Sequence, residues 1–173
     1  MAKKYLTIIL IILGAQAELR AQGSKEIFTI YLVRHAEKDL TANNSSDPPL
    51  TECGEQRAES LKRFLSDVHL DRVYSTNYNR TKNTALPTAI SKGLKVVEYN
   101  PQNLKDFSKL LIDSSQDALV VGHSNTTGVL AGLLVGEDIG DFDLAIYNRV
   151  YQVVMYKTNG RLHLLHTSFS CND

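Results

Sequence analysis

The sequence lacks an excess of charge of either sign, because its 173 residues include 19 basic and 19 acidic side chains. Proteins that bind nucleic acid through its phosphates usually carry a basic surface, and the composition gives no indication of one. We therefore expect no nucleic-acid partner. With 43% hydrophobic residues the chain has an ordinary globular composition, and its length predicts one domain.

The longest apolar run is too short to span a bilayer comfortably. It covers residues 5–14, follows Lys3 and Lys4, and is followed by Ala15-Gln16-Ala17. This order of basic, apolar and small residues predicts a signal peptide and leader over residues 1–23, cleaved near Ala17 or Ala21. We expect residues 24–173 to form one exported domain, periplasmic or secreted, without stable membrane insertion after cleavage. A buried N-terminal helix or an uncleaved anchor is the alternative interpretation.

Cysteine is scarce, and motifs for metal binding are missing. The chain contains no CxxC and no HExxH, so we expect neither a metal site nor a cofactor. His35-Ala36-Glu37 has the HxE form of a zinc deaminase, but that chemistry also needs a later PCxxC, which the sequence lacks. Export would permit a disulfide between Cys53 and Cys171, and two buried or free thiols are the alternative interpretation.

Segments typical of strands alternate with segments typical of helices. We expect strands at residues 26–33, 71–75, 95–99 and 118–122, and helices at 51–67, 79–91, 103–112 and 126–134. Thr51 is placed to cap the first helix, and Pro87 to disturb the second. A final hairpin, residues 150–157 and 161–167, is expected to turn at Thr158-Asn159-Gly160. The order predicts an α/β three-layer sandwich with a largely parallel central sheet flanked by helices, plus a C-terminal β-hairpin.

Reactive side chains follow three of these expected strands. Arg34 and His35 follow the first strand, Arg80 lies at the start of the helix after the second, and His123 follows Gly122. The carboxyl ends of parallel strands meet at one edge, where such sheets bind ligands. Guanidinium groups suit phosphoryl oxygens, a neutral imidazole is a competent nucleophile, and Gly122 would let a ligand approach the backbone.

Four segments resemble the signatures of the histidine phosphatase superfamily, the phosphoglycerate-mutase-like group. Leu32 to Glu37 is similar to its RHG/RHA signature, and Leu50 to Ala58 to its LTxxGxxQA element. Tyr74 to Ala85 is similar to the SSPxxRxxxTA element, and Val121 to Thr126 to the VGHxxx element. The segments occur in the family's order, and the resemblance as a whole spans essentially residues 27 to 135.

The resemblance implies a role for each residue. His35 would attack phosphorus, Arg34 and Arg80 would hold the phosphoryl oxygens, and His123 would complete a phosphate site that also includes Ser124. Water would then hydrolyse the phosphohistidine. We expect a metal-independent phosphomonoesterase of the histidine acid phosphatase-like type, acting on a small phosphorylated substrate. His35 should be neutral, with its second nitrogen donating to a backbone carbonyl or a similar acceptor.

The sequence does not single out one residue as the proton donor for the leaving group. Many superfamily members take it from an insertion after the third strand, which is short here at residues 98–103. Glu98 is the nearest candidate, and Glu37 and Asp39 beside the nucleophile are alternatives. Further residues are candidates for the mouth of the pocket: Lys38, the loop of residues 43–49, Asn125, Asp141, Tyr147 and Arg149.

Two other functions remain open on the sequence. A non-catalytic phosphate-binding or signalling module would keep Arg34 and Arg80 while dispensing with turnover. A phosphomutase would use the same nucleophile, although the short loops and the expected export disfavour it. The sequence indicates neither the natural substrate nor the oligomeric state.

Overall fold

The computed structural model describes residues 25–171, so the expected signal peptide lies outside the described residues. Within residues 25–171, no helix combines the length and apolarity needed to cross a membrane. Strands and helices alternate in the order β1 Ile27–Arg34, α2 Glu52–Phe64, β2 Arg72–Ser75, α3 Asn79–Ser91, β3 Val96–Glu98, α4 Leu104–Ser114, β4 Ala118–Gly122, α5 Ser124–Val135, β5 Arg149–Tyr156 and β6 Asn159–His166.

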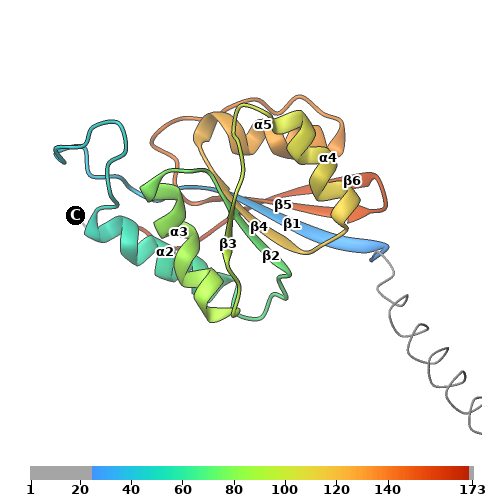
Figure 1. The fold of residues 1–173 in the computed structure, drawn as a ribbon, viewed down its shortest axis with the longest axis horizontal. Helices are drawn as coiled ribbons and strands as arrows, with labels where there is room; N and C mark the ends of the chain where they lie inside the picture. The colour runs from blue at the N-terminus through green and yellow to red at the C-terminus, as the bar shows by residue number, and fades with distance from the viewer. Residues whose placement is uncertain (1–24, 172–173) are drawn as a thin grey trace, which may run out of the picture.

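The strands form one six-stranded sheet in the order β3-β2-β4-β1-β5-β6 (Figure 1). The four strands from β3 to β1 run parallel, whereas β5 pairs antiparallel with β1 and β6 antiparallel with β5. Arg34, at the end of β1, pairs with Gly122 at the end of β4, and Ser75 ends β2 beside Val121. The expected α/β sandwich and terminal hairpin are thus confirmed, and three strand ends meet at one edge.

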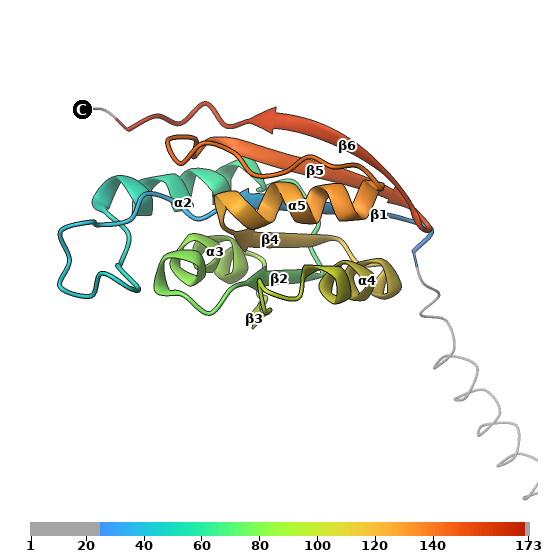
Figure 2. The same ribbon diagram turned by 90° about the horizontal axis from the view of Figure 1, so that it is seen from above.

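Helices cover both faces of the sheet, as Figures 1 and 2 show. Alternate residues of β1 divide between two apolar clusters because successive side chains of a strand point to opposite faces. Phe28, Ile30 and Leu32 pack with α4 and α5, whereas Tyr31 and Val33 pack with α2 and α3. β4 is buried at every position, as expected for a parallel strand covered on both faces.

Local signals place the helix ends close to their expected positions. Thr51 caps α2, since its Oγ1 accepts a hydrogen bond from Gly54 N at 3.0 Å. α2 ends at Phe64, earlier than residue 67, and α3 continues through Pro87 from Asn79 to Ser91. α5 begins at Ser124 rather than at residue 126, because His123 is its N-cap and donates its backbone N–H to Thr126 Oγ1 at 2.8 Å.

The terminal hairpin turns earlier than the Asn-Gly pair predicted. Tyr156 pairs with Asn159, so Lys157 and Thr158 form the turn, and Lys157 adopts a positive φ of 55°. Gly160 is paired within β6, and a Cβ there would lie 2.7 Å from Leu134 O at the end of α5. A close approach between helix and strand, rather than turn conformation, therefore explains this glycine.

Candidate active site

A cavity of about 970 Å³ opens at the carboxyl edge of the sheet. It brings together the five residues expected to bind phosphate, which come from three separate elements: Arg34, His35, Arg80, His123 and Ser124. The cavity also includes Lys38, Asn125 and Asp141 from the expected mouth, together with Tyr78 and Asp143.

His35 is buried at the end of β1, with 4% of its surface exposed. Its Nδ1 lies 2.7 Å from the carbonyl oxygen of Ala36, which can only accept a hydrogen bond. Nδ1 therefore carries the proton, and Nε2 keeps the lone pair, as the nucleophile expectation required. Burial, together with the nearby charges of Arg34 and Arg80, lowers the pKa of His35 to about 3.

His123 lies across the cavity, with its ring centroid 5.5 Å from that of His35. Its Nε2 lies 3.0 Å from Thr76 Oγ1, which in turn lies 2.9 Å from Thr81 Oγ1. These two buried hydroxyls fix the ring, and because a hydroxyl both donates and accepts, they suit either neutral tautomer. Burial lowers the pKa of His123 to about 4, with Arg80 and Arg34 adding to the effect.

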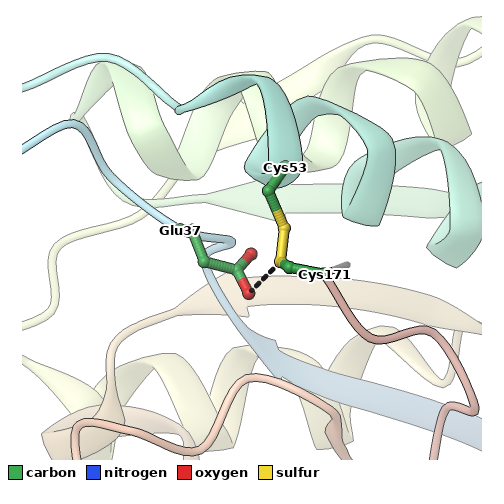
Figure 3. Close-up of side chains that lie close together, drawn as sticks. All are labelled: Glu37, Cys53 and Cys171. Atoms are coloured by element: carbon green, nitrogen blue, oxygen red, sulfur yellow. Dashed lines mark hydrogen bonds between the residues drawn. A yellow bond between two sulfur atoms is a disulfide. The ribbon is translucent and has the colours of Figure 1, made fainter. Parts of the chain in front are cut away.

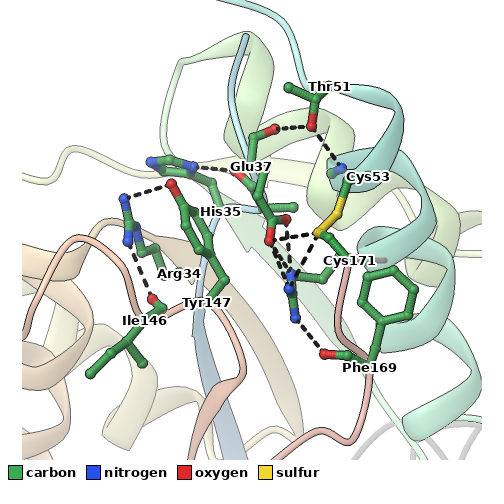
Figure 4. Close-up of polar contacts among 12 residues, drawn as sticks. Arg34, His35, Glu37, Thr51, Cys53, Ile146, Tyr147, Phe169 and Cys171 are labelled. Atoms are coloured by element: carbon green, nitrogen blue, oxygen red, sulfur yellow. Dashed lines mark hydrogen bonds and ion pairs between the residues drawn. A yellow bond between two sulfur atoms is a disulfide. The ribbon is translucent and has the colours of Figure 1, made fainter. Parts of the chain in front are cut away.

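The Arg34 guanidinium is hydrogen-bonded to protein groups through Nη1, whereas its Nε has no hydrogen-bond partner within the described residues. Its Nη1 donates to the carbonyl oxygens of Leu144 and, at 3.2 Å, of Ile146. Tyr147 stacks on it at 4.1 Å and places its hydroxyl 3.4 Å from Nη2, as Figure 4 shows. The buried Nε has no hydrogen-bond partner among residues 25–171. Nε and Nη2 together form an edge of the kind that can bind an oxyanion bidentately.

Arg80 lies in the first turn of α3, over the ring of Tyr78 at 4.3 Å. Its Nε is likewise buried and without a partner in the described part of the chain. Asp47, from the polar loop before α2, accepts from the backbone N–H of Asn79 at 2.9 Å and lies 3.5 Å from Arg80 Nη1. A loop carboxylate thus contacts both the N-terminus of α3 and the arginine expected to bind phosphate.

Gly122 serves a different purpose from the one expected. A Cβ at this position would lie 2.6 Å from the Tyr99 hydroxyl and 2.8 Å from Thr126 Oγ1. The missing side chain therefore makes room for the side chains of Tyr99 and Thr126. Thr126 uses this room to accept the His123 N–H.

The candidate proton donors Glu98, Glu37 and Asp39 are not among the residues that line the cavity. The Glu98 carboxylate pairs with Lys82 at 2.6 Å, and Asp39 accepts from Thr41 at 2.6 Å. Glu37 pairs with Arg57 at 2.7 Å. The acids that do line the cavity are Asp141 and Asp143, on the segment between α5 and β5.

Cys53 and Cys171 form a disulfide, which the sequence had left open. Their Cα atoms lie 5.7 Å apart, and Cys171 Sγ lies 3.3 Å from Glu37 Oε1, as Figure 3 shows. The bond attaches the segment after β6 to α2, behind the loop that carries His35. Arg57, which holds Glu37 here, was not identified from the sequence. The one sequence feature that could have indicated it is that Arg57 stands in the LTECGEQRA segment where the family element has Gln.

Comparisons with known proteins found relatives of part of the chain. The sequence profile of the histidine phosphatase superfamily (branch 1) matches residues 30–101. Phosphoserine phosphatase 1 of Hydrogenobacter thermophilus is 40% identical over 73 residues, which cover 40% of this chain and 35% of that protein. Fructose-2,6-bisphosphatase TIGAR of Xenopus tropicalis is 33% identical over 79 residues, which cover 40% of this chain and 29% of that protein. The chain thus matches about a third of the length of these curated relatives.

Solved structures extend the similarity of fold to the remaining strands. The protein histidine phosphatase SixA, complexed with tungstate, superposes with a TM-score of 0.66 at 19% identity, over 81% of this chain and 97% of that one. The alpha-ribazole phosphatase from Shigella flexneri gives a TM-score of 0.68 at 16% identity, over 84% and 100%. The phosphoglycerate mutase from Bacillus anthracis gives 0.62 at 16% identity, over 82% and 94%. Residues 30–101 are thus similar in sequence to the histidine phosphatase superfamily, and the solved structures show that the described domain shares the fold of its members.

Proposed function

We propose that this chain is a phosphomonoesterase that works through a phosphohistidine on His35 and needs no metal ion. One observation carries the proposal: a neutral, buried histidine shares a cavity with two arginines whose Nε donors have no partner within residues 25–171. A buried donor without a partner is costly unless a ligand satisfies it. A phosphoryl group, with three charged oxygens, supplies the acceptors that both arginines lack.

The residues account for a balanced two-step reaction. The Nε2 lone pair of His35 attacks phosphorus and the bond from phosphorus to the ester oxygen breaks, so that the alcohol leaves with a proton from an acid. Water then attacks phosphorus and gives one proton back to the deprotonated acid, the N–P bond breaks, and inorganic phosphate, the protonated acid and neutral His35 are released or restored. The Nδ1–H···O=C bond to Ala36 keeps the ring oriented in both steps.

Positive charge in the cavity supports the proposal in two ways. Arg34, Arg80 and Lys38 stabilise charge on the phosphoryl oxygens and at the same time disfavour a divalent cation. Ser124, at the first position of the twelve-residue α5, adds the N-terminus of a helix, where anions are favoured. The tungstate of the SixA structure, an oxyanion in a related fold, is consistent with such a site.

We further propose that the leaving group takes its proton from the segment of residues 137–148. Asp141 and Asp143 lie on this segment and line the cavity. The Asp143 carboxylate already accepts a hydrogen bond from Ala145 N at 2.7 Å, so we assign the proton to Asp141.

Export is also a proposal. The basic, apolar and small residues at the N-terminus support it. The disulfide supports it as well, because such bonds persist in oxidising compartments. Fractionation of cells that produce the full-length chain tests it, with export predicting a shortened chain outside the cytoplasm.

The first experiment measures hydrolysis of p-nitrophenyl phosphate by the purified protein in the presence of a chelator. His35→Ala serves as the test variant and His163→Ala, on β6, as the matched control. Turnover that survives the chelator, disappears in His35→Ala and leaves an acid-labile phosphate on the wild-type protein is expected. A protein that binds phosphate but never becomes phosphorylated would instead be a non-catalytic phosphate-binding module.

A further inference from the structure

Arg57 holds the carboxylate of Glu37, on the loop that follows β1 and carries His35, and neither of the two residues lines the cavity. Its Nε lies 2.9 and 2.8 Å from the two carboxylate oxygens, and its Nη2 lies 2.7 Å from Oε1. The two side chains are only 12% and 18% exposed. A bidentate pair with so little exposure restricts both partners more than an exposed ion pair does.

The Glu37 end of this pair is fixed to the nucleophile through two peptide bonds. Glu37 follows His35 by two residues, and its carbonyl oxygen accepts from Thr51 N at 2.9 Å. α2 approaches so closely that a Cβ on Gly54 would lie 2.3 Å from that same oxygen. The first turn of α2 therefore sets the backbone position of the loop that carries His35.

The Arg57 end reaches Arg34 through Tyr147. Arg34 and Arg80, the two arginines proposed to bind the phosphoryl group, form the phosphate clamp. The ring centroid of Tyr147 lies 5.9 Å from Arg57 Cζ and 4.1 Å from Arg34 Cζ. Figure 4 shows this ring beside Arg34, and the ring centroid of His35 lies 6.5 Å away. An aromatic ring that contacts two guanidinium groups restricts the position of both.

The disulfide completes the arrangement from the C-terminal side. Arg57 Nη1 donates to Phe169 O at 3.1 Å, and its Cζ lies 5.0 Å from the Phe169 ring. Two residues later Cys171 bonds to Cys53, on the same helix as Arg57. The disulfide therefore keeps Phe169 against Arg57, in a segment that follows the last strand.

We propose that Arg57 is a positioning residue for the phosphate clamp, and that it holds this position only while the Cys53–Cys171 disulfide is intact. Arg57 does not line the cavity, so it acts through Tyr147 on Arg34 and through Glu37 on His35. The inference rests on the proposed function for its effect on turnover. Its effect on phosphate binding follows from the geometry alone.

The first test measures the affinity for inorganic phosphate by calorimetry, alongside kcat and KM for p-nitrophenyl phosphate. Arg57→Met removes the fork, Arg57→Lys keeps the charge without it, and Arg63→Met is a control on the same helix. We expect both Arg57 variants to weaken phosphate binding and kcat/KM by about ten- to a hundred-fold, the effect of misplacing a binding group by a fraction of an ångström to one ångström. Arg63→Met should match the wild type.

A double-mutant cycle with Tyr147→Leu identifies the route of the effect. Arg57→Met should weaken phosphate binding far less when Tyr147 is already replaced. Full additivity would overturn the proposed connection through Tyr147. A lower melting temperature with unchanged phosphate affinity and kcat per folded molecule would show that Arg57 is only structural, and would overturn the whole inference.

The disulfide is tested by reduction. A dithiol reductant converts the bond into two thiols and is itself oxidised to a disulfide, so that two electrons and two protons are transferred. We expect reduced wild type and Cys171→Ser to bind phosphate as weakly as Arg57→Met, and reduction to change Arg57→Met little. Full phosphate affinity with both thiols demonstrably free would overturn the role of the disulfide. A wild type that binds phosphate but does not hydrolyse the ester would contradict the proposed function alone.

Discussion

Asp47 and Arg80 are far apart in the sequence, yet the Asp47 carboxylate lies 3.5 Å from the Arg80 guanidinium at the start of α3. The backbone N–H of Asn79 donates to the same carboxylate, with Asn79 N lying 2.9 Å from Oδ1 and 3.1 Å from Oδ2. A fixed negative charge therefore lies beside an arginine that we expect to bind a dianion. The Asp47 carboxylate and a bound phosphate would repel each other, and such repulsion is strongest where solvent is limited. Solvent is limited here, because the side chains of Asp47 and Arg80 are only 26% and 12% exposed.

Asp47→Asn should strengthen phosphate binding. The amide keeps an oxygen that accepts from Asn79 N but removes the charge that repels phosphate. We expect the inhibition constant of inorganic phosphate to fall about two- to five-fold, as for losing about 0.5–1 kcal/mol of charge interaction. Asp113→Asn, on α4, is the control. A higher inhibition constant would mean that Asp47 mainly holds Arg80 in place.

Replacing either arginine by lysine should be costly even though the charge is retained. Lysine cannot supply the fork that the unpartnered Nε atoms of Arg34 and Arg80 offer. We expect kcat/KM for p-nitrophenyl phosphate to fall by about 10²–10³-fold for each variant, as when a transition-state donor is lost. Arg161→Lys, exposed on β6, should retain wild-type values, and equal activity in all three variants would contradict the assignment.

Asp141→Asn should affect poor leaving groups most. An alkyl alkoxide needs a proton as it departs, whereas p-nitrophenolate leaves without one. We expect kcat for an alkyl phosphomonoester to fall by about 10²–10⁴-fold, with a much smaller loss for p-nitrophenyl phosphate. Asp143→Asn provides the comparison on the same segment. An unchanged ratio of the two rates in Asp141→Asn would exclude Asp141 as the acid.

Both histidines of the cavity should make the protein less stable in acid. Burial lowers the pKa of His35 to about 3 and of His123 to about 4, whereas both have the ordinary value of 6.5 when unfolded. Between these values the unfolded chain binds more protons, so stability falls as the pH drops from about 6.5 towards the folded pKa. The loss approaches about 1.4 kcal/mol per pH unit for each histidine.

Melting temperatures between pH 7 and pH 4 check this expectation. His35→Gln and His123→Gln should each lose less stability over the range than the wild type, whereas His163→Gln should follow the wild type. The low pKa of His35 also predicts that the nucleophile stays neutral, and hence competent, down to about pH 3. Parallel curves for all four proteins would mean that neither cavity histidine has a lowered pKa.

Local sequence signals predicted most of the fold. The β4 segment was predicted residue for residue because an apolar run of that length fits a covered parallel strand. Thr51 predicted a helix start because its hydroxyl has a local partner three residues later. The Asn159-Gly160 pair gave a wrong prediction of the turn position. In sequence, a glycine that allows a neighbouring helix to approach closely cannot be distinguished from a glycine that forms a turn.

The sequence by itself determined the alternation of strands and helices and the residues that the strand ends bring together, Arg34, His35, Arg80 and His123. Those properties depend on local periodicity and on the rule that parallel strands share a carboxyl edge. Only the tertiary structure decided the partners of the charged groups. Glu37 lies two residues from the nucleophile, yet its carboxylate binds Arg57 on α2, and the disulfide that holds this arrangement joins residues 118 positions apart. Such contacts depend on the packing of distant segments, because the direction of a long side chain is fixed by what surrounds it.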